Sequence, residues 1–185
     1  MRRHAVEPLP LPGITRSRSM KMLGIKIAND FTVTQHVQQL AMSSAQTIYA
    51  LQVLRTRGLS TVALQHVFRS IVVARLMYAA SSWRGLTKAS DHQRINSVID
   101  RAHRSGYCSP DLPTFDDLCD AADDELFAKA ARLSKHVLHS LLPPPSTASQ
   151  RYDLRQRIHS LQLPEHSTHL SDCNFLMRML YKNKY

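Results

Sequence analysis

Three arginines have the type and spacing needed to hold phosphate groups. Arg94, Arg101 and Arg104 are seven and three residues apart, so on a helix they lie close to one line. Such a line of guanidinium groups can follow a phosphate backbone without reading its sequence. Alternatively, this face is merely solvated, with Asp91 pairing with Arg94. Asp100 would pair with Arg104 in the same way, each pair contributing about 0.2–0.5 kcal/mol. The spacing leaves both interpretations open.

The charge around these arginines favours a polyanionic partner. The 185 residues carry a formal net charge of +10, and 43% of them are hydrophobic, enough for a core. Residues 1–107 hold 15 Lys and Arg against four acidic residues, whereas residues 108–142 hold three against seven. Residues 31–90 contain no acid but six bases, which are Arg55, Arg57, Arg69, Arg75, Arg84 and Lys88. Nucleic acid is the expected partner, while an acidic membrane surface or an acidic protein remains an alternative.

Two further lysines lie in a segment that alternates as a β-strand does. Lys21 and Lys26 interrupt the apolar residues of 20–27, and Leu23-Gly24 breaks the alternation as a bulge or a close-approach site would. Asn29-Asp30 supplies a turn signal, after which residues 31–33 are expected to return as a second strand. The pattern predicts a short basic hairpin, and an ordinary edge hairpin without a ligand shows the same spacing.

Helices are expected to position these groups. We expect one helix over 34–57 ending at Gly58, a second over 60–83 capped by Ser60, and a third from Ser90 to Gly106. The third helix should bury one stripe, which consists of Ile95, Val98, Ile99 and Ala102. The segment 70–80 is apolar but far shorter than the ~20 residues that a membrane span needs, so it predicts a buried helix and no membrane partner.

The second half of the chain differs in composition. Thr114 is a capping residue before an acidic first turn, so one or two acidic helices should reach about residue 142. A Pro- and Ser-rich linker follows over 143–149, and a short helix over 172–181, capped by Ser171, should end the chain. The expected fold is mainly α, with a hairpin region over 1–33, a three-helix bundle over 34–107, an acidic helical segment over 108–142 and a tail over 143–185.

Other reactive side chains have less specific patterns. His166, His169 and Cys173 could offer three metal ligands, but a structural site needs four and no Cys-x2-Cys pair accompanies them, so solvated histidines are expected and no cofactor is predicted. Cys108 and Cys119 are expected to be half-buried thiols. An odd number of cysteines without a secretory signal indicates a reduced intracellular chain, nuclear or cytoplasmic. The sequence sets no oligomeric state.

Three aromatic residues could stack on a base or a ribose, namely Tyr78, Trp83 and Tyr107. Aromatic residues at helix ends more often anchor the core of a bundle. Both roles stay open from the sequence, with the core role favoured.

The chain resembles the C-terminal part of LINE-type (non-LTR) retrotransposon reverse transcriptases. The resemblance starts with residues 11–30, which are similar to the end of the palm, and continues through strings similar to the helical thumb. The similar strings after residue 30 are 36–37, 44–58, 67–78, 89–94, 106–108, 121–127, 152–155 and 178–182. They follow one order along nearly the whole chain.

This resemblance implies a role for each basic segment. The Leu23-Gly24 hairpin would be the primer grip, which holds the DNA 3′ end, and the helices would grasp an RNA–DNA hybrid. Lys21, Lys26, Arg55 and Arg57 would join the three arginines in neutralising phosphates. The intact parent enzyme uses Mg2+ held by palm aspartates, and these would lie before residue 1. The acidic pairs at 116–117 and 123–124 sit in predicted helices, not on a turn between strands, so we do not expect catalysis by this chain alone.

The alternative is a degenerate retroelement product, or an interaction module that uses the acidic segment on a basic partner. A helix-turn-helix DNA binder fits less well, since residues 67–80 are too apolar to lie in a groove.

Overall fold

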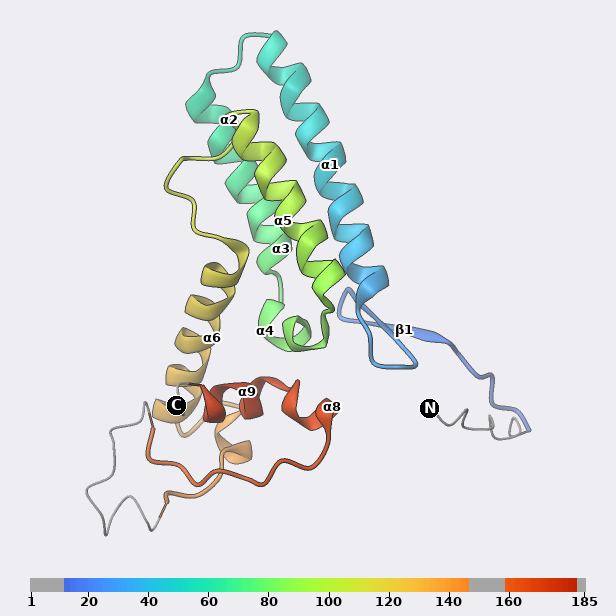
Figure 1. Cartoon of the computed structure of the whole chain (residues 1–185), viewed down its shortest axis with the longest axis vertical. Helices are drawn as coiled ribbons and strands as arrows, with labels where there is room; N and C mark the ends of the chain where they lie inside the picture. Colours follow the sequence, from blue (N-terminus) through green and yellow to red (C-terminus); the bar gives the residue numbers. More distant parts are fainter. Residues whose placement is uncertain (1–11, 147–158, 183–185) are drawn as a thin grey trace.

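A computed structural model describes residues 12–146 and 159–182 of the chain. Its elements are an N-terminal hairpin, a bundle of three long helical rods, an acidic helix beside the bundle, and a C-terminal segment beneath that helix (Figure 1). The predicted mainly α fold with a short hairpin is confirmed. Residues 1–11 of the predicted hairpin region and residues 147–149 of the predicted linker lie outside the described residues.

The hairpin pairs β1 (Ser19–Met22) with β2 (Ile25–Ala28) in antiparallel register. Leu23 and Gly24 form the turn between them, and both have positive φ angles, 47° and 88°, as the central residues of a type I′ turn do. The predicted bulge at this position is therefore wrong, because the chain reverses direction there. The predicted second strand over 31–33 is wrong for the same reason, since those residues lead into the first helix.

The first helix, α1 (Thr34–Thr56), and the fifth, α5 (Ala89–Arg104), run parallel to each other. At their starts, Thr34 Oγ1 donates a hydrogen bond to Asp91 Oδ2 at 2.9 Å. At their ends, Arg55 Nη1 donates to the Ser105 carbonyl at 2.8 Å. Both helices lie within two residues of their predicted bounds, and Gly58 and Gly106 follow them with positive φ angles, as predicted. The first turn of α5 is preceded by Lys88, so the predicted cap at Ser90 is wrong.

The middle rod runs antiparallel to α1 and α5 and has four parts. These are α2 (Thr61–Phe68), the π-helical η1 (Arg69–Val73), α3 (Ala74–Met77) and, after a break, α4 (Ala80–Trp83) with the 3-10 turn η2 (Arg84–Leu86). Ser60 caps α2 as predicted, its hydroxyl accepting from the Ala63 N–H. A single helix to residue 83 was expected, but Ala79 has a φ of 50° and ends the rod near Tyr78.

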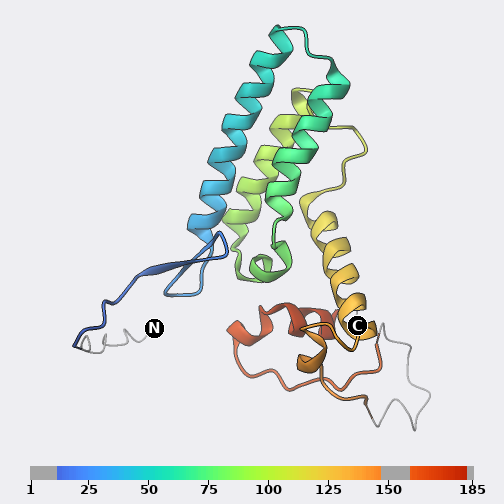
Figure 2. The same ribbon diagram turned by 180° about the vertical axis from the view of Figure 1, so that it is seen from behind.

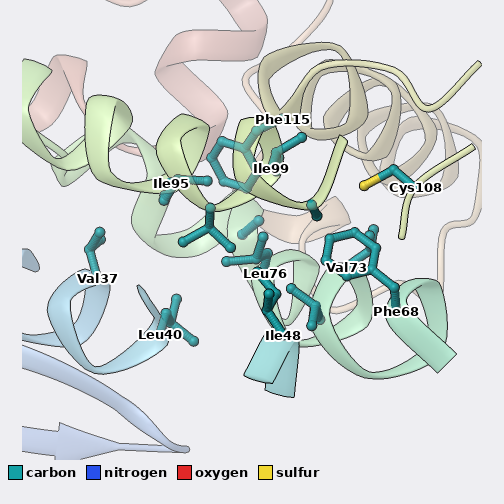
Figure 3. Close-up of a cluster of buried hydrophobic side chains, with 14 of the residues drawn as sticks. Val37, Leu40, Ile48, Phe68, Val73, Leu76, Ile95, Ile99, Cys108 and Phe115 are labelled. Atoms are coloured by element: carbon teal, nitrogen blue, oxygen red, sulfur yellow. The ribbon is translucent and has the colours of Figure 1, made fainter. Parts of the chain in front are cut away.

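One core joins the three rods and the start of the acidic helix, as Figure 3 shows for the side chains that meet there. The predicted stripe of α5 is buried, with Ile95 and Ala102 fully enclosed. Trp83 and Tyr107 belong to this core, each 1% exposed, which confirms the core role expected for both. Tyr78 differs, because its side chain is exposed and its hydroxyl donates to the Leu23 carbonyl at 3.2 Å. The bundle thereby contacts the hairpin turn.

The acidic segment forms a single helix, α6 (Phe115–Arg132), followed by the 3-10 turn η3 (His139–Leu141). Thr114 caps it and forms a capping box with Asp117, as predicted. The described part of the C-terminal segment contains two short helices, α8 (His169–Asp172) and α9 (Phe175–Tyr181), where one was expected. Asn174 caps α9 by accepting from the Met177 N–H at 2.9 Å, so the predicted cap at Ser171 is wrong and the predicted helix begins three residues later than expected.

Burial also governs the reactivity of the cysteines. Cys108 and Cys119 are buried in the core, more deeply than the half-buried positions that were expected, and burial raises the pKa of Cys108 to about 11 and that of Cys119 to about 12. Cys173 is only partly buried. We therefore expect a thiol reagent at pH 8 to label Cys173 rapidly, and the other two only after unfolding in denaturant. Rapid labelling of two or three thiols in the folded chain would contradict this burial.

Candidate nucleic-acid interface

The hairpin presents its two lysines on one face. Lys21 and Lys26 are directly opposite each other in the register, and so are Met22 and Ile25 on the other face. Ile25 packs into the core, which turns the lysine face outward. Like charges facing each other across two strands destabilise a hairpin unless an anion lies between them. The arrangement fits a phosphate held by both ammonium groups.

The hairpin turn projects from the molecule. Leu23 is 83% exposed and holds a left-handed conformation that only glycine, asparagine or aspartate adopts without strain. Gly24 lies against Tyr78, since a Cβ atom on this glycine would be 3.7 Å from the tyrosine ring. A strained, exposed turn braced by an exposed tyrosine is a feature of binding surfaces more than of cores.

The predicted line of arginines on α5 is present, and one of the three arginines is already paired with an aspartate. Arg94 Nη1 lies 3.0 Å from Asp91 Oδ1, so the first of the two local pairs considered from the sequence is formed. The structure records no such pair between Asp100 and Arg104, although it describes both side chains. At about 100° per residue, Arg94 and Arg101 lie within about 20° of each other, and Arg104 about 60° further round.

The two arginines at the end of α1 have different surroundings. Arg55 binds the Ser105 carbonyl, and its guanidinium lies 5.0 Å from the centroid of the Tyr107 ring. It therefore fastens the end of α5, a role the sequence did not indicate. Arg57 follows α1 and is exposed. Among the described residues, no acidic side chain lies within ion-pair distance of Lys21, Lys26, Arg57, Arg101 or Arg104.

The candidate residues lie on the hairpin, at the end of α1 and along α5. The hairpin lies at one end of the bundle, and Arg57 lies at the other end of α1 (Figures 1 and 2). The 23 residues of α1 span about 34 Å, which matches one helical turn of a nucleic-acid duplex, roughly 34–36 Å. A duplex lying along the bundle could thus meet the hairpin and α5 together.

The acidic side chains of α6 lie away from the hairpin and form ion pairs with basic residues of the same chain. In both views α6 lies across the bundle from the hairpin (Figures 1 and 2). Arg84 Nη1 binds Asp120 at 2.5 Å, and Lys182 binds Asp124 at 2.7 Å. Burial disfavours the charged form of Arg84, but the hydrogen bond and charge of Asp120 outweigh it and hold the pKa of Arg84 above its ordinary value. The acidic segment therefore meets its basic partners in this chain.

Asp123 is the centre of this ion-pair network and was not singled out from the sequence. Its side chain is 2% exposed, and its Oδ2 accepts from Arg178 Nη1 at 2.8 Å. Arg178 also donates to the Ser81 carbonyl at 2.9 Å, which joins α9 to α4. Beside it, a Cβ atom on Gly85 would lie 1.9 Å from the Cys173 carbonyl oxygen, so only glycine fits there. These contacts dock the C-terminal segment onto the bundle.

A sequence signal for Asp123 existed. It occupies the third place in a series of every fourth residue on α6, and the other three places hold Phe115, Cys119 and Phe127, all buried. A carboxylate in an apolar stripe predicts a buried partner. The same reasoning identifies Asp91, which is fully buried on the stripe of Ile95 and Val98.

His36 is a second buried polar residue, and it makes stability depend on pH. Its ring meets Trp83 edge-on at 5.4 Å, and its Nε2 has no hydrogen-bond partner in the described part of the chain. Burial lowers the pKa of His36 from its ordinary value of 6.5. Below pH 6.5, His36 is protonated in the unfolded chain but stays neutral in the folded chain until the pH is lower still. The free energy of unfolding should therefore fall as the pH falls.

We expect denaturant titrations at pH 7.5 and pH 5.5 to show this loss, and His36→Gln to make the loss smaller. The difference between wild type and variant isolates His36 from the other histidines. An unchanged pH dependence in the variant would show that His36 does not contribute.

The histidines and the cysteine that were considered as metal ligands have local partners. His166 Nδ1 lies 2.8 Å from Asp172 Oδ1, and Cys173 Sγ lies 3.7 Å from His169 Nδ1. Within residues 12–146 and 159–182, no group of three His, Cys, Asp or Glu side chains is arranged to hold a metal ion. Over the same residues, no helix has both the length and the apolar character needed to cross a bilayer.

Comparison with known proteins adds no family. The chain matches no protein-family model, no curated protein and no solved structure. Function is therefore argued from the residues and their geometry.

Proposed function

We propose that the chain corresponds to the palm-edge hairpin, thumb and following segment of a LINE-type reverse transcriptase, and that it binds primer–template nucleic acid through the hairpin and α5. The observation that carries the proposal is the separation of charge. Lys21, Lys26, Arg101 and Arg104 have no acidic partner among the described residues, while the acids of α6 pair with Arg84, Arg178 and Lys182. The order of hairpin before helices agrees with the resemblance of the sequence.

Binding in this proposal is electrostatic and independent of sequence. Lys21 and Lys26 hold one phosphate region at the hairpin, and Arg101 and Arg104 hold another on α5. Ammonium and guanidinium groups that contact phosphates release counterions, which favours binding at low salt. Arg94 contributes less than its neighbours because Asp91 already neutralises it.

No catalysis is proposed for the chain alone. The acidic pair at 116–117 begins α6, where Asp117 belongs to the capping box. The pair at 123–124 lies in the middle of the same helix, and both carboxylates bind bases of this chain. A two-metal polymerase site needs carboxylates that are free to hold Mg2+ near a primer end.

The alternative, an interaction module that offers the acidic segment to a basic partner, is less favoured. Its acids would first have to leave Arg84, Arg178 and Lys182, and the Asp123 pairs are buried. Taking a partner from a buried charge costs several kcal/mol, roughly 3–5.

Fluorescence anisotropy with a labelled RNA–DNA hybrid tests the proposal. At low salt we expect the purified chain to bind the hybrid, and we expect no primer extension when Mg2+ and nucleotides are added. Absence of binding at about 50 mM salt would contradict the proposal, since non-specific electrostatic binding is strongest there.

A further inference from the structure

A groove between α1 and α5 is distinct from the hairpin and was not indicated by the sequence. It has a volume of about 300 Å³, and its lining is mostly apolar. Ala41, Ala45 and Ile48 line it from α1, and Val98 lines it from α5. The two alanines have small side chains and lie four residues apart on the same face of α1, so another backbone can approach this side of the groove closely. We refer to this feature as the α1–α5 groove.

Apolar surface continues from the groove onto the outer face of α1. Met42 lines the groove and is 67% exposed, and Tyr49, two turns further along α1, is 69% exposed. Large exposed side chains on one helix face, next to an apolar groove, mark an interaction surface more than a solvated one. The floor of the α1–α5 groove and its α1 side are therefore both apolar.

The opposite wall of the groove is basic. Arg94 and Arg101 line it from α5, whereas α1 has no charged residue before Arg55. A ligand that fills this groove must therefore be apolar on the face it buries, acidic on the flank toward α5 and uncharged on the flank toward α1. An amphipathic α-helix of a partner protein with acidic residues on one flank satisfies all three conditions.

The direction of α1 and α5 sets the direction of such a helix. The two run parallel, as the contacts at both of their ends show, so the positive ends of their dipoles point the same way. A helix laid antiparallel in the groove opposes both dipoles and completes a four-helix arrangement with α1, α5 and the middle rod. The groove admits a helix in either direction sterically, and electrostatics favour this one.

We propose that the α1–α5 groove docks an amphipathic helix of a partner protein, bound antiparallel to α1, with its acidic flank mainly on Arg101. Arg94 contributes less, because Asp91 already pairs with it. A nucleic acid fits this surface less well, because phosphates gain nothing from a floor of alanine, isoleucine and valine side chains. The proposal does not rest on nucleic-acid binding, although both ligands would contact Arg101. A bound helix would therefore compete with a duplex on this part of α5.

A pair of labelled synthetic helices tests the proposal. Each has about 18 residues, leucines along one face and glutamines elsewhere, and one flank is either all Glu or all Lys. We expect the Glu helix to bind the full chain at least about tenfold more tightly than the Lys helix, a difference of about 1.4 kcal/mol.

Variants of the chain locate the binding. Ala45→Gln fills the groove floor with a good helix former, and Arg101→Gln removes charge from its wall. Each should weaken binding of the Glu helix at least about tenfold. Arg69→Gln removes one exposed arginine outside the groove and should have little effect. Circular dichroism and thermal unfolding confirm that each variant is folded.

Three outcomes would overturn the proposal. Absence of binding of the Glu helix at about 0.2 mM would mean an affinity weaker than a specific groove allows. Equal binding of both helices would remove the role of the arginines. If Ala45→Gln weakens RNA–DNA binding as much as peptide binding, the groove belongs to nucleic acid. Failure of hybrid binding with intact, groove-dependent peptide binding would instead contradict only the proposed function.

Discussion

Replacing Lys21, Lys26, Arg101 and Arg104 by glutamine is expected to weaken binding of an RNA–DNA hybrid at least about 100-fold at 50 mM salt, because each base that contacts a phosphate adds about 0.9 to the salt slope of the affinity. All four side chains lack acidic partners in the described structure, and Lys21, Arg101 and Arg104 are exposed. Their loss should therefore leave the fold intact and remove only the charge.

A matched control separates local contacts from net charge. Glutamine at Arg69, Lys129, Arg132 and Lys135 also removes four positive charges, but from side chains outside the proposed interface. Lys129 already pairs with Glu125 at 2.6 Å. We expect this control to weaken binding only slightly. An equal loss in both variants would show that net charge alone causes binding, and no loss in the first variant would show that the hairpin and α5 do not bind.

Replacing Asp123 by alanine is expected to lower the free energy of unfolding by about 3–5 kcal/mol, the usual effect of removing one partner from a buried ion pair. Arg178 would lose its carboxylate while it stays partly buried between α9, α6 and α4, and Arg84 would lose one of three carboxylates. Denaturant unfolding followed by circular dichroism measures the change.

The neighbouring residue provides the control for this prediction. Asp124 pairs with Lys182 at 2.7 Å, but its side chain is 52% exposed. Exposed pairs contribute about 0–1 kcal/mol, so Asp124→Ala should change stability little. Equal effects at the two positions would show that the network around Asp123 is not the contact that docks the C-terminal segment.

Patterns of local periodicity predicted much of this fold. The alternation over 20–27 indicated a hairpin, and the stripe of Ile95, Val98, Ile99 and Ala102 indicated the buried face of α5, because both follow from one-dimensional spacing. The turn was placed wrongly because Leu23 adopts a left-handed conformation that leucine rarely takes. The break at Ala79 was missed for the same reason, since alanine is normally a helix former.

Contacts between distant segments could not be predicted from spacing. Arg55 looked like a phosphate ligand and instead binds the end of α5, 50 residues away. Arg84 lay in the acid-free window, yet α6 supplies its acids. The absence of acids from residues 31–90 therefore overstated the unpaired positive charge of the bundle. The hairpin lysines, Arg101 and Arg104 have no acidic partner among the described residues. The candidate interface is therefore smaller than the sequence indicated.

The salt dependence of hybrid binding tests the central claim most directly. With four bases on phosphates, the affinity of the wild-type chain should fall with a slope of about −3 to −4 in a plot of log affinity against log salt, or about 100-fold between 50 and 200 mM. A slope near zero, or no binding at the lowest salt, would contradict an electrostatic grip on the duplex.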